Sequence, residues 1–96
     1  MSNGQRIPVE LFLEDGCESA SMVLRTIEEV GEHFPLDTRI HARATDPAAF
    51  IRHGVLITPA TYIDGHLAFY GSMTPAEFIS YIYNHVRWTA GAHEHV

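Results

Sequence analysis

The sequence predicts a single α/β domain in the order β-α-β-α-β-β-α, with a four-stranded mixed sheet and helices on both of its faces. Three observations predict this class. Short apolar runs typical of strands alternate with stretches in which apolar residues recur at helical spacing. Two segments carry a proline directly after a helix-capping residue, which marks the start of a helix. Asp64-Gly65 separates two short apolar runs and predicts a tight hairpin.

The composition is that of one globular domain spanning residues 1–96. Of its 96 residues, 46% are hydrophobic and 19% are charged, which suits a single core. A net charge of −6, with six scattered arginines and no lysine, argues against binding to nucleic acid. No apolar run is long enough to cross a membrane, and no apolar signal segment begins the sequence, so we expect a cytoplasmic location. We expect residues 1–6 and 90–96 to be flexible.

The first half of the chain predicts two strands joined by a helix. Residues 7–13 are a short, apolar run and therefore predict a buried strand. Apolar residues recur at helical spacing over residues 18–33, and Pro35 ends this helix because the residue before a proline avoids the α region. Residues 36–44 predict a second strand. Two strands joined through a helix should be parallel.

Two further helices are predicted from their capping residues. Asp46 precedes a proline and predicts a short helix over residues 47–53, which Gly54 ends. Residues 74–77 (TPAE) carry the same signal in a fuller form, with a threonine cap and a glutamate at the third helical position. We expect the final helix to run to about Trp88.

The hairpin strands are predicted at residues 60–63 and 66–70. The turn residues Asp64-Gly65 tolerate the positive φ angles of a type I′ turn. A regular two-residue hairpin would pair Ala60 with Phe69 and place both on one face. Both faces of the hairpin carry apolar side chains, so we expect the sheet to be covered on both sides.

This order of elements, together with particular residues, resembles the thioredoxin-like superfamily. The likeness spans roughly residues 6–88, and the size of the chain is similar to that of glutaredoxins and the smallest thioredoxins. The residues that carry it are Cys17 at a strand-to-helix junction, Asp46-Pro47, Gly54-Val55, Thr58-Pro59-Ala60 and Ile63-Asp64-Gly65.

The resemblance implies a thioredoxin-like fold and assigns roles to several residues. Cys17 would be the nucleophilic cysteine, and Pro59 would be the cis-proline beside it. The backbone of Thr58 would pair with an extended segment of a bound partner, as an added strand. The other residues expected to contact the partner are Gly16, Glu18, Ser19 and Ala20.

The motif Cys17-Glu18-Ser19-Ala20 is a monothiol variant of the two-cysteine motif, because Ala20 stands where the family has its second cysteine. Without a resolving cysteine, a mixed disulfide cannot be released by internal attack, so a dithiol reductase cycle is excluded for the isolated chain. Any enzymatic activity would be that of a thiol–disulfide oxidoreductase that relies on a second molecule. Monothiol glutaredoxins use glutathione for this step. The expected partner is therefore a protein or a low-molecular-weight thiol such as glutathione, and we expect no cofactor.

Two effects oppose each other at the Cys17 thiol. The first turn of a helix favours the thiolate and lowers a cysteine pKa. The carboxylates of Glu14, Asp15 and Glu18 disfavour the thiolate, and no arginine is adjacent to them in the sequence. We therefore expect a thiol less acidic than that of a typical superfamily member.

Three functions remain open from the sequence. The first is formation of mixed disulfides through Cys17. The second is a non-catalytic thioredoxin-fold accessory module that binds another protein. The third is carriage of a metal or an iron–sulfur cluster by a dimer that uses Cys17 of each chain.

His93 and His95, with His85, could bind a metal, but HxH near a chain end is more typical of an exposed tail, and we predict no metal site. The other histidines, which we interpret as surface or edge residues, are His33, His41, His53 and His66.

Overall fold

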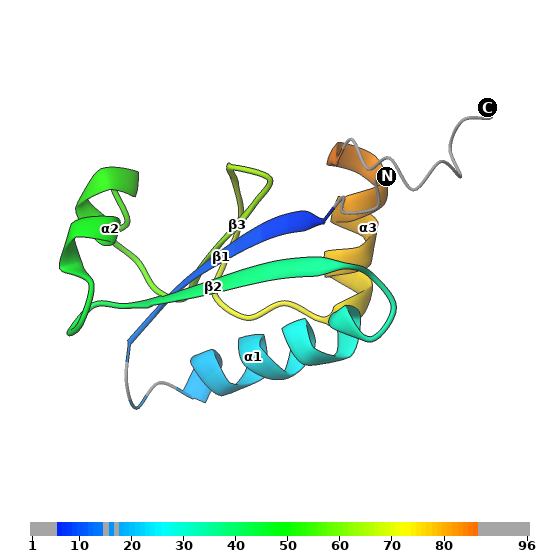
Figure 1. Ribbon diagram of the computed structural model, residues 1–96. Helices are drawn as coiled ribbons and strands as arrows, with labels where there is room; N and C mark the ends of the chain where they lie inside the picture. The colour runs from blue at the N-terminus through cyan, green and yellow to red at the C-terminus, as the bar shows by residue number, and fades with distance from the viewer. Residues whose placement is uncertain (1–5, 15, 17, 87–96) are drawn as a thin grey trace.

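The computed structural model describes residues 6–14, 16 and 18–86 of the chain (Figure 1). Its elements are β1 (Ile7–Leu13), α1 (Glu18–Gly31), β2 (Leu36–Ala42), α2 (Pro47–His53), β3 (Ala60–Ile63), β4 (His66–Tyr70) and α3 (Pro75–His85). The strands form one mixed sheet in the order β2-β1-β3-β4. This architecture confirms the predicted fold class. Of the two ends expected to be flexible, only Arg6 lies within the described residues.

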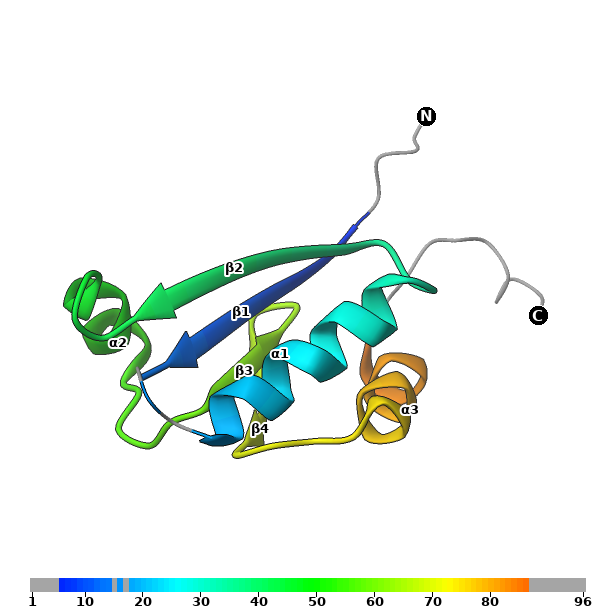
Figure 2. The ribbon, with the colours of Figure 1, turned by 90° about the horizontal axis from the view of Figure 1, so that it is seen from below.

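The directions of the strands bring distant loops to one end of the sheet. β1 and β2 are parallel along their whole length, from Ile7 opposite Leu36 to Leu13 opposite Ala42. β3 runs antiparallel to β1 and begins with Ala60 close to the carboxyl end of β1. The loop that enters β3 therefore lies at the same end of the sheet as the loop that leaves β1 (Figure 2).

The hairpin turn forms as predicted, but the register beyond it differs. Asp64 and Gly65 have φ angles of 54° and 83°, the positive values that a type I′ turn requires. A bulge then places an extra residue in β4, so that Ala60 lies opposite Tyr70. The predicted pairing of Ala60 with Phe69 is wrong, because a bulge moves every later side chain to the other face. Phe69 consequently packs toward α3.

Each face of the sheet carries its own core. Alternate residues of β1 point to opposite faces, so one strand supplies both cores. The larger core lies between the sheet and the α1–α3 pair, and its buried members are Ile7, Val9, Leu11, Leu13, Ala20, Val23, Ile27, Val30, Ile63, Met73, Phe78 and Ile82. The smaller core lies under α2 and is formed by Phe12, Ala49, Phe50, Val55 and Ala60.

The capping residues predicted for α2 and α3 do cap these helices. The Asp46 side chain accepts from the backbone N–H of Ala49, and Gly54 ends α2 in a left-handed conformation with φ 66°. Thr74 starts α3 with a reciprocal capping box. α3 is described to His85, and Trp88 lies outside the described residues. Among the residues described, no helix has the length and apolar character needed to span a membrane.

Candidate functional site

The candidate site lies where β1 ends and α1 begins. Gly16 is exposed and has a φ of 76°, a left-handed conformation that favours glycine, and Glu18, which begins α1, is also exposed. Cys17, between them in the sequence, lies outside the described residues. Ser19 is half-buried, whereas the Ala20 side chain is buried in the larger core. Of the residues expected to contact a partner on α1, Gly16 and Glu18 are therefore the most accessible.

The loop before β3 reaches the same end of the sheet. The Thr58–Pro59 peptide bond is cis. Pro59 is buried, and its carbonyl accepts the N–H of Gly71 at 2.7 Å. Among the described residues, no hydrogen bond uses the backbone N–H or C=O of Thr58. Thr58 thus offers a backbone donor and acceptor beside a fixed proline.

Two hollows lie near this end of the sheet, one at the start of α1 and the other beside α2 and the beginning of the loop that enters β3. One has a volume of about 450 Å³ and is lined by Leu13, Glu14, Gly16, Glu18, Ser21 and Leu24, among others. The other has a volume of about 470 Å³ and is lined by Arg43, Pro47, Phe50, Ile51, Gly54 and Leu56, among others.

An ion pair joins the two hollows. Arg43 Nε contacts Glu14 Oε2, and the Arg43 guanidinium carbon lies 4.5 Å from the centre of the Phe50 ring. The parallel register brings Arg43 to this position, because its N–H donates to Leu13 O at the end of β1. No arginine is adjacent to Glu14, Asp15 or Glu18 in the sequence, but the fold brings Arg43 to Glu14, and Arg43 compensates its charge.

Exposed apolar side chains cluster along the loop that enters β3. Ile51, Leu56 and Ile57 are 79%, 85% and 59% exposed. Leu56 and Ile57 directly precede Thr58 in the chain. Isolated exposed apolar residues are common, whereas Ile51 and Leu56 line the same hollow and Ile57 follows Leu56 in the chain. This exposure was not predicted, although two bulky apolar residues between a helix-ending glycine and a proline could have indicated it.

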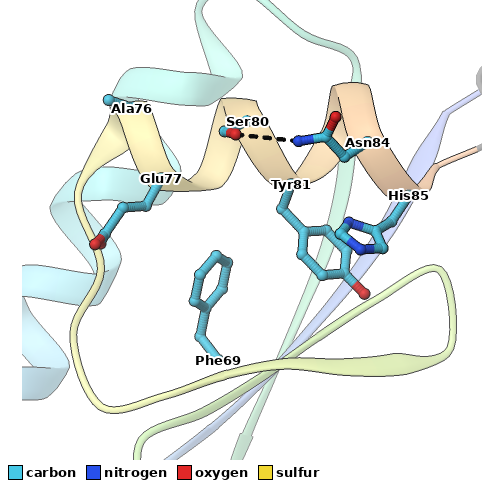
Figure 3. Close-up of a pocket in the computed structure, with 7 residues that line it drawn as sticks. All are labelled: Phe69, Ala76, Glu77, Ser80, Tyr81, Asn84 and His85. Atoms are coloured by element: carbon cyan, nitrogen blue, oxygen red, sulfur yellow. Dashed lines mark hydrogen bonds between the residues drawn. The ribbon is translucent and has the colours of Figure 1, made fainter.

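A shallow groove of about 420 Å³ lies between α3 and β4 (Figure 3). Its lining includes Tyr81, which stacks on His85 with ring centres 4.3 Å apart. Ser80 and Asn84 are joined by a 3.3 Å hydrogen bond, and the Glu77 carboxylate accepts the N–H of Thr74. Glu77, Ser80 and Asn84 thus make hydrogen bonds within α3 or to its capping residue. The groove shares no lining residue with the two hollows.

The sequence matches the family model described as a thioredoxin domain over residues 7–84. The chain belongs to the thioredoxin domain family. No curated protein matches the sequence.

Solved structures of thioredoxins share the fold of this thioredoxin domain. Thioredoxin-2 of the malaria parasite, a component of its protein secretion machinery, has a TM-score of 0.74 at 10% identity, over 88% of this chain and 87% of that one. The Fasciola hepatica thioredoxin has a TM-score of 0.70 at 17% identity, over 84% and 82%. Thioredoxin 1 of Thermosipho africanus has a TM-score of 0.67 at 20% identity, over 79% and 90%.

The thioredoxin domain also holds a group of titratable side chains on its α2 face. His41 lies on edge strand β2, as predicted for a surface or edge residue, but its side chain is only 15% exposed. Its Nε2 lies 3.3 Å from Glu10 Oε1, and its Nδ1 lies 2.8 Å from Asp46 Oδ2. His53 Nε2 lies 3.5 Å from the same oxygen of Glu10. The Phe12 ring stacks on His41 with centres 4.8 Å apart.

This group favours the ionised form of Asp46. The hydrogen bond from His41 is the main cause that holds the pKa of Asp46 below its ordinary value of 3.8, with a further contribution from the N–H of Ala49. Within residues 6–14, 16 and 18–86, no three His, Cys, Asp or Glu side chains are arranged to hold a metal ion. His93 and His95 fall outside these residues.

Proposed function

We propose that this thioredoxin domain forms mixed disulfides through Cys17 and that the Thr58–Pro59 loop orients the partner. In this reaction, the Cys17 thiolate attacks one sulfur of a partner disulfide. A new S–S bond forms, and the other partner sulfur leaves as a thiolate. A second, external thiol then attacks the mixed disulfide and restores Cys17. Position 20 cannot supply that thiol, because it is an alanine whose side chain is buried in the core.

The observation that carries this proposal is the exposed apolar pair Leu56–Ile57 beside Thr58, whose backbone has no hydrogen bond to any described residue. An extended peptide bound as an added strand needs these two features, a backbone edge and pockets or patches for alternate side chains. They favour a protein segment with apolar residues near its cysteine.

Glutathione is less well supported as the partner. Its two carboxylates require cationic or backbone N–H partners. The cation that lines the hollows beside the loop is Arg43, which is already paired with Glu14. We therefore favour a protein over an anionic small thiol.

The test compares two disulfides as substrates of the purified chain. One is glutathione protected as a mixed disulfide with thionitrobenzoate, so that both substrates have the same leaving group. The other is a short apolar peptide with one cysteine, protected as a mixed disulfide with thionitrobenzoate, whose release is followed by absorbance. We expect faster reaction with the peptide, and no reaction of either with Cys17→Ser. Ile57→Asp should slow the peptide reaction selectively. Leu67→Asp is the matched control, because Leu67 is an exposed apolar residue on β4.

A second function is a binding module without disulfide chemistry, favoured by the absence of a second cysteine at Ala20. In that case, a peptide with serine in place of its cysteine would bind wild type and Cys17→Ser equally. The protected cysteine peptide would release no thionitrobenzoate with either protein. Covalent capture that depends on Cys17 would contradict the binding-module function. A coloured, metal-containing protein after purification would instead support a metal or iron–sulfur carrier.

A further inference from the structure

β2 is an open edge of the sheet. It is the outermost strand and pairs with β1 alone among the described elements. Seen from below, β2 runs along the border of the described sheet, with α1 beneath the sheet rather than beyond this border (Figure 2). β2 has seven residues in uninterrupted register, and it contains neither proline nor lysine. Proteins usually protect such edges with proline, bulges or charged side chains. β2 carries two exposed charges of opposite sign, Asp37 and Arg39, so its long regular edge is suited to pairing with a strand that presents the complementary charges.

The hydrogen bonds of β2 identify which backbone groups face outward. Pro35 O accepts from Ile7 of β1, and the N–H of Arg43 donates to Leu13 O, so odd-numbered residues direct their backbone groups toward β1. Because successive residues alternate, the N–H and C=O groups of the even-numbered residues point away from the sheet. These residues are Leu36, Thr38, Ile40 and Ala42, and the Ala42 carbonyl already accepts the N–H groups of Thr45 and Asp46. The Leu36 carbonyl has only a long contact of 3.4 Å with the exposed Arg6 side chain.

We propose that two copies of this chain pair through β2, antiparallel and centred on Thr38, to form a continuous eight-stranded sheet. Thr38 would lie opposite Thr38 of the second copy, and Leu36 opposite Ile40. Both kinds of pair join outward-facing backbone groups, so they would be hydrogen-bonded pairs. Asp37 and Arg39 would lie opposite each other in the closer, non-hydrogen-bonded pairs.

The side chains select this register. Asp37 and Arg39 are both exposed, and the register centred on Thr38 forms two opposite-charge pairs. Centring the pair on Arg39 or Asp37 would instead place two like charges directly opposite each other, which is destabilising. On the other face, Ile40 is 56% exposed at the edge of the sheet and would be covered by Leu36 of the second copy. In the register centred on Thr38, each charged residue of β2 therefore meets an opposite charge, and the apolar residues Leu36 and Ile40 meet each other.

This inference does not depend on the proposed function. All measurements use the Cys17→Ser background, so that no dimer can form through a disulfide. Sedimentation equilibrium of this protein should give twice the chain mass at high concentration, and one chain mass on dilution. A mass of one chain throughout would overturn the proposal.

Charge exchange tests the register. Asp37→Arg and Arg39→Asp should each be monomeric, because each places like charges opposite each other. Mixing the two variants should restore a dimer that contains one chain of each kind, and the double variant should again pair with itself. If both single variants stay dimeric, the contact lies elsewhere. Failure of the mixture to associate would also contradict the register, and association in the mixture excludes misfolding of the variants.

The backbone provides an independent test. Thr38→Pro removes an outward-facing N–H and leaves the β1 ladder intact, because only odd-numbered residues donate to β1. We expect a monomer with an unchanged circular dichroism spectrum. An unchanged dimer would overturn the strand pairing. If Thr38→Pro, Asp37→Arg and Arg39→Asp all remain dimeric, the two copies associate through a surface other than β2.

Discussion

Asp46 Oδ2 lies 2.8 Å from His41 Nδ1, so the carboxylate that caps α2 also contacts a side chain of β2. The other oxygen, Oδ1, accepts from the N–H of Ala49 in the first turn of α2 at 3.4 Å. One carboxylate thereby fixes the position of α2 against the edge of the sheet. The Phe12 ring and Glu10 hold His41 in place from β1.

The first prediction concerns the acid stability that Asp46 provides. Its pKa is lowered in the folded protein, mainly by the hydrogen bond with His41, so the stabilisation is present above the ordinary value of 3.8 and is lost as the pH falls through the folded value. Asp46→Asn should keep the helix cap but lose the charge. We expect a lower urea midpoint than wild type at neutral pH and a difference that shrinks in acid. Asp46→Ala, which loses both roles, should be less stable than Asp46→Asn.

The second prediction concerns alkaline stability and Tyr62. Its hydroxyl donates to His53 O at 3.1 Å, and burial is the main cause that raises its pKa above 10.0, followed by the effect of Tyr70. A raised folded-state pKa stabilises the protein below pH 10.0, and this stabilisation is lost as the pH rises further. Tyr62→Phe should be less stable by about 0.5–1.5 kcal/mol at neutral pH. Its urea midpoint should also fall less steeply above pH 10.0 than that of wild type. An equal alkaline decline in both proteins would contradict this assignment.

The third prediction concerns the buried hydrogen bond between α1 and the segment before α3. Thr26 is 5% exposed, and its hydroxyl donates to Met73 O at 2.7 Å. Thr26→Val keeps the shape but leaves this carbonyl without its partner, so we expect a loss of about 1–3 kcal/mol in the free energy of unfolding. Thr26→Ser is the matched control, because it keeps the donor and removes one methyl group. If urea unfolding shows Thr26→Ser to be the less stable of the two, packing matters more than the hydrogen bond.

The fourth prediction concerns the aromatic packing of the smaller core. Phe12 is fully buried, and its ring lies 5.1 Å from the Phe50 ring and 5.4 Å from the Tyr62 ring. Phe12→Ala should destabilise the protein by about 3–5 kcal/mol, because it opens a cavity beside the rings of Phe50 and Tyr62. Phe12→Leu should cost clearly less. Thermal or urea unfolding measures both, and equal losses would show that the site collapses around either side chain.

The elements of this domain were predictable because their signals are local. The Asp64-Gly65 turn, the caps at Asp46 and Thr74, and the helical spacing of apolar residues each act within a few positions. The features that were missed depend on residues far apart in the sequence. Arg43 reaches Glu14, 29 positions away, only through the register of two parallel strands. The bulge that turns Phe69 toward α3 likewise follows from packing between elements.

The same contrast between local signals and long-range contacts explains which features of the candidate site were predicted. The Thr58–Pro59 segment was identified from its residues, whereas the exposure of Leu56 and Ile57 depends on how the loop leaves α2. Exposure of an apolar side chain is decided by what the rest of the chain leaves uncovered. A local sequence pattern does not contain that information.

The fifth prediction concerns the charges beside Cys17. Arg43 compensates Glu14 across the two hollows, so removing either charge should change the electrostatic potential at the start of α1. Arg43→Gln should raise the pH midpoint of Cys17 alkylation by iodoacetamide by roughly half a pH unit, since an uncompensated carboxylate disfavours the thiolate. Glu14→Gln should lower the midpoint by a similar amount, and the double variant should return it close to wild type.

Salt provides the control for this fifth prediction. Charge effects at an exposed pair weaken when ionic strength rises, so the separation between the two single variants should narrow in high salt. A change of midpoint that persists in high salt would instead indicate that Arg43 acts through its packing on Phe50, with a centroid distance of 4.5 Å. Arg43→Lys distinguishes these roles, because lysine keeps the charge and loses the planar contact with the ring. A midpoint close to that of wild type in Arg43→Lys would assign the effect to charge.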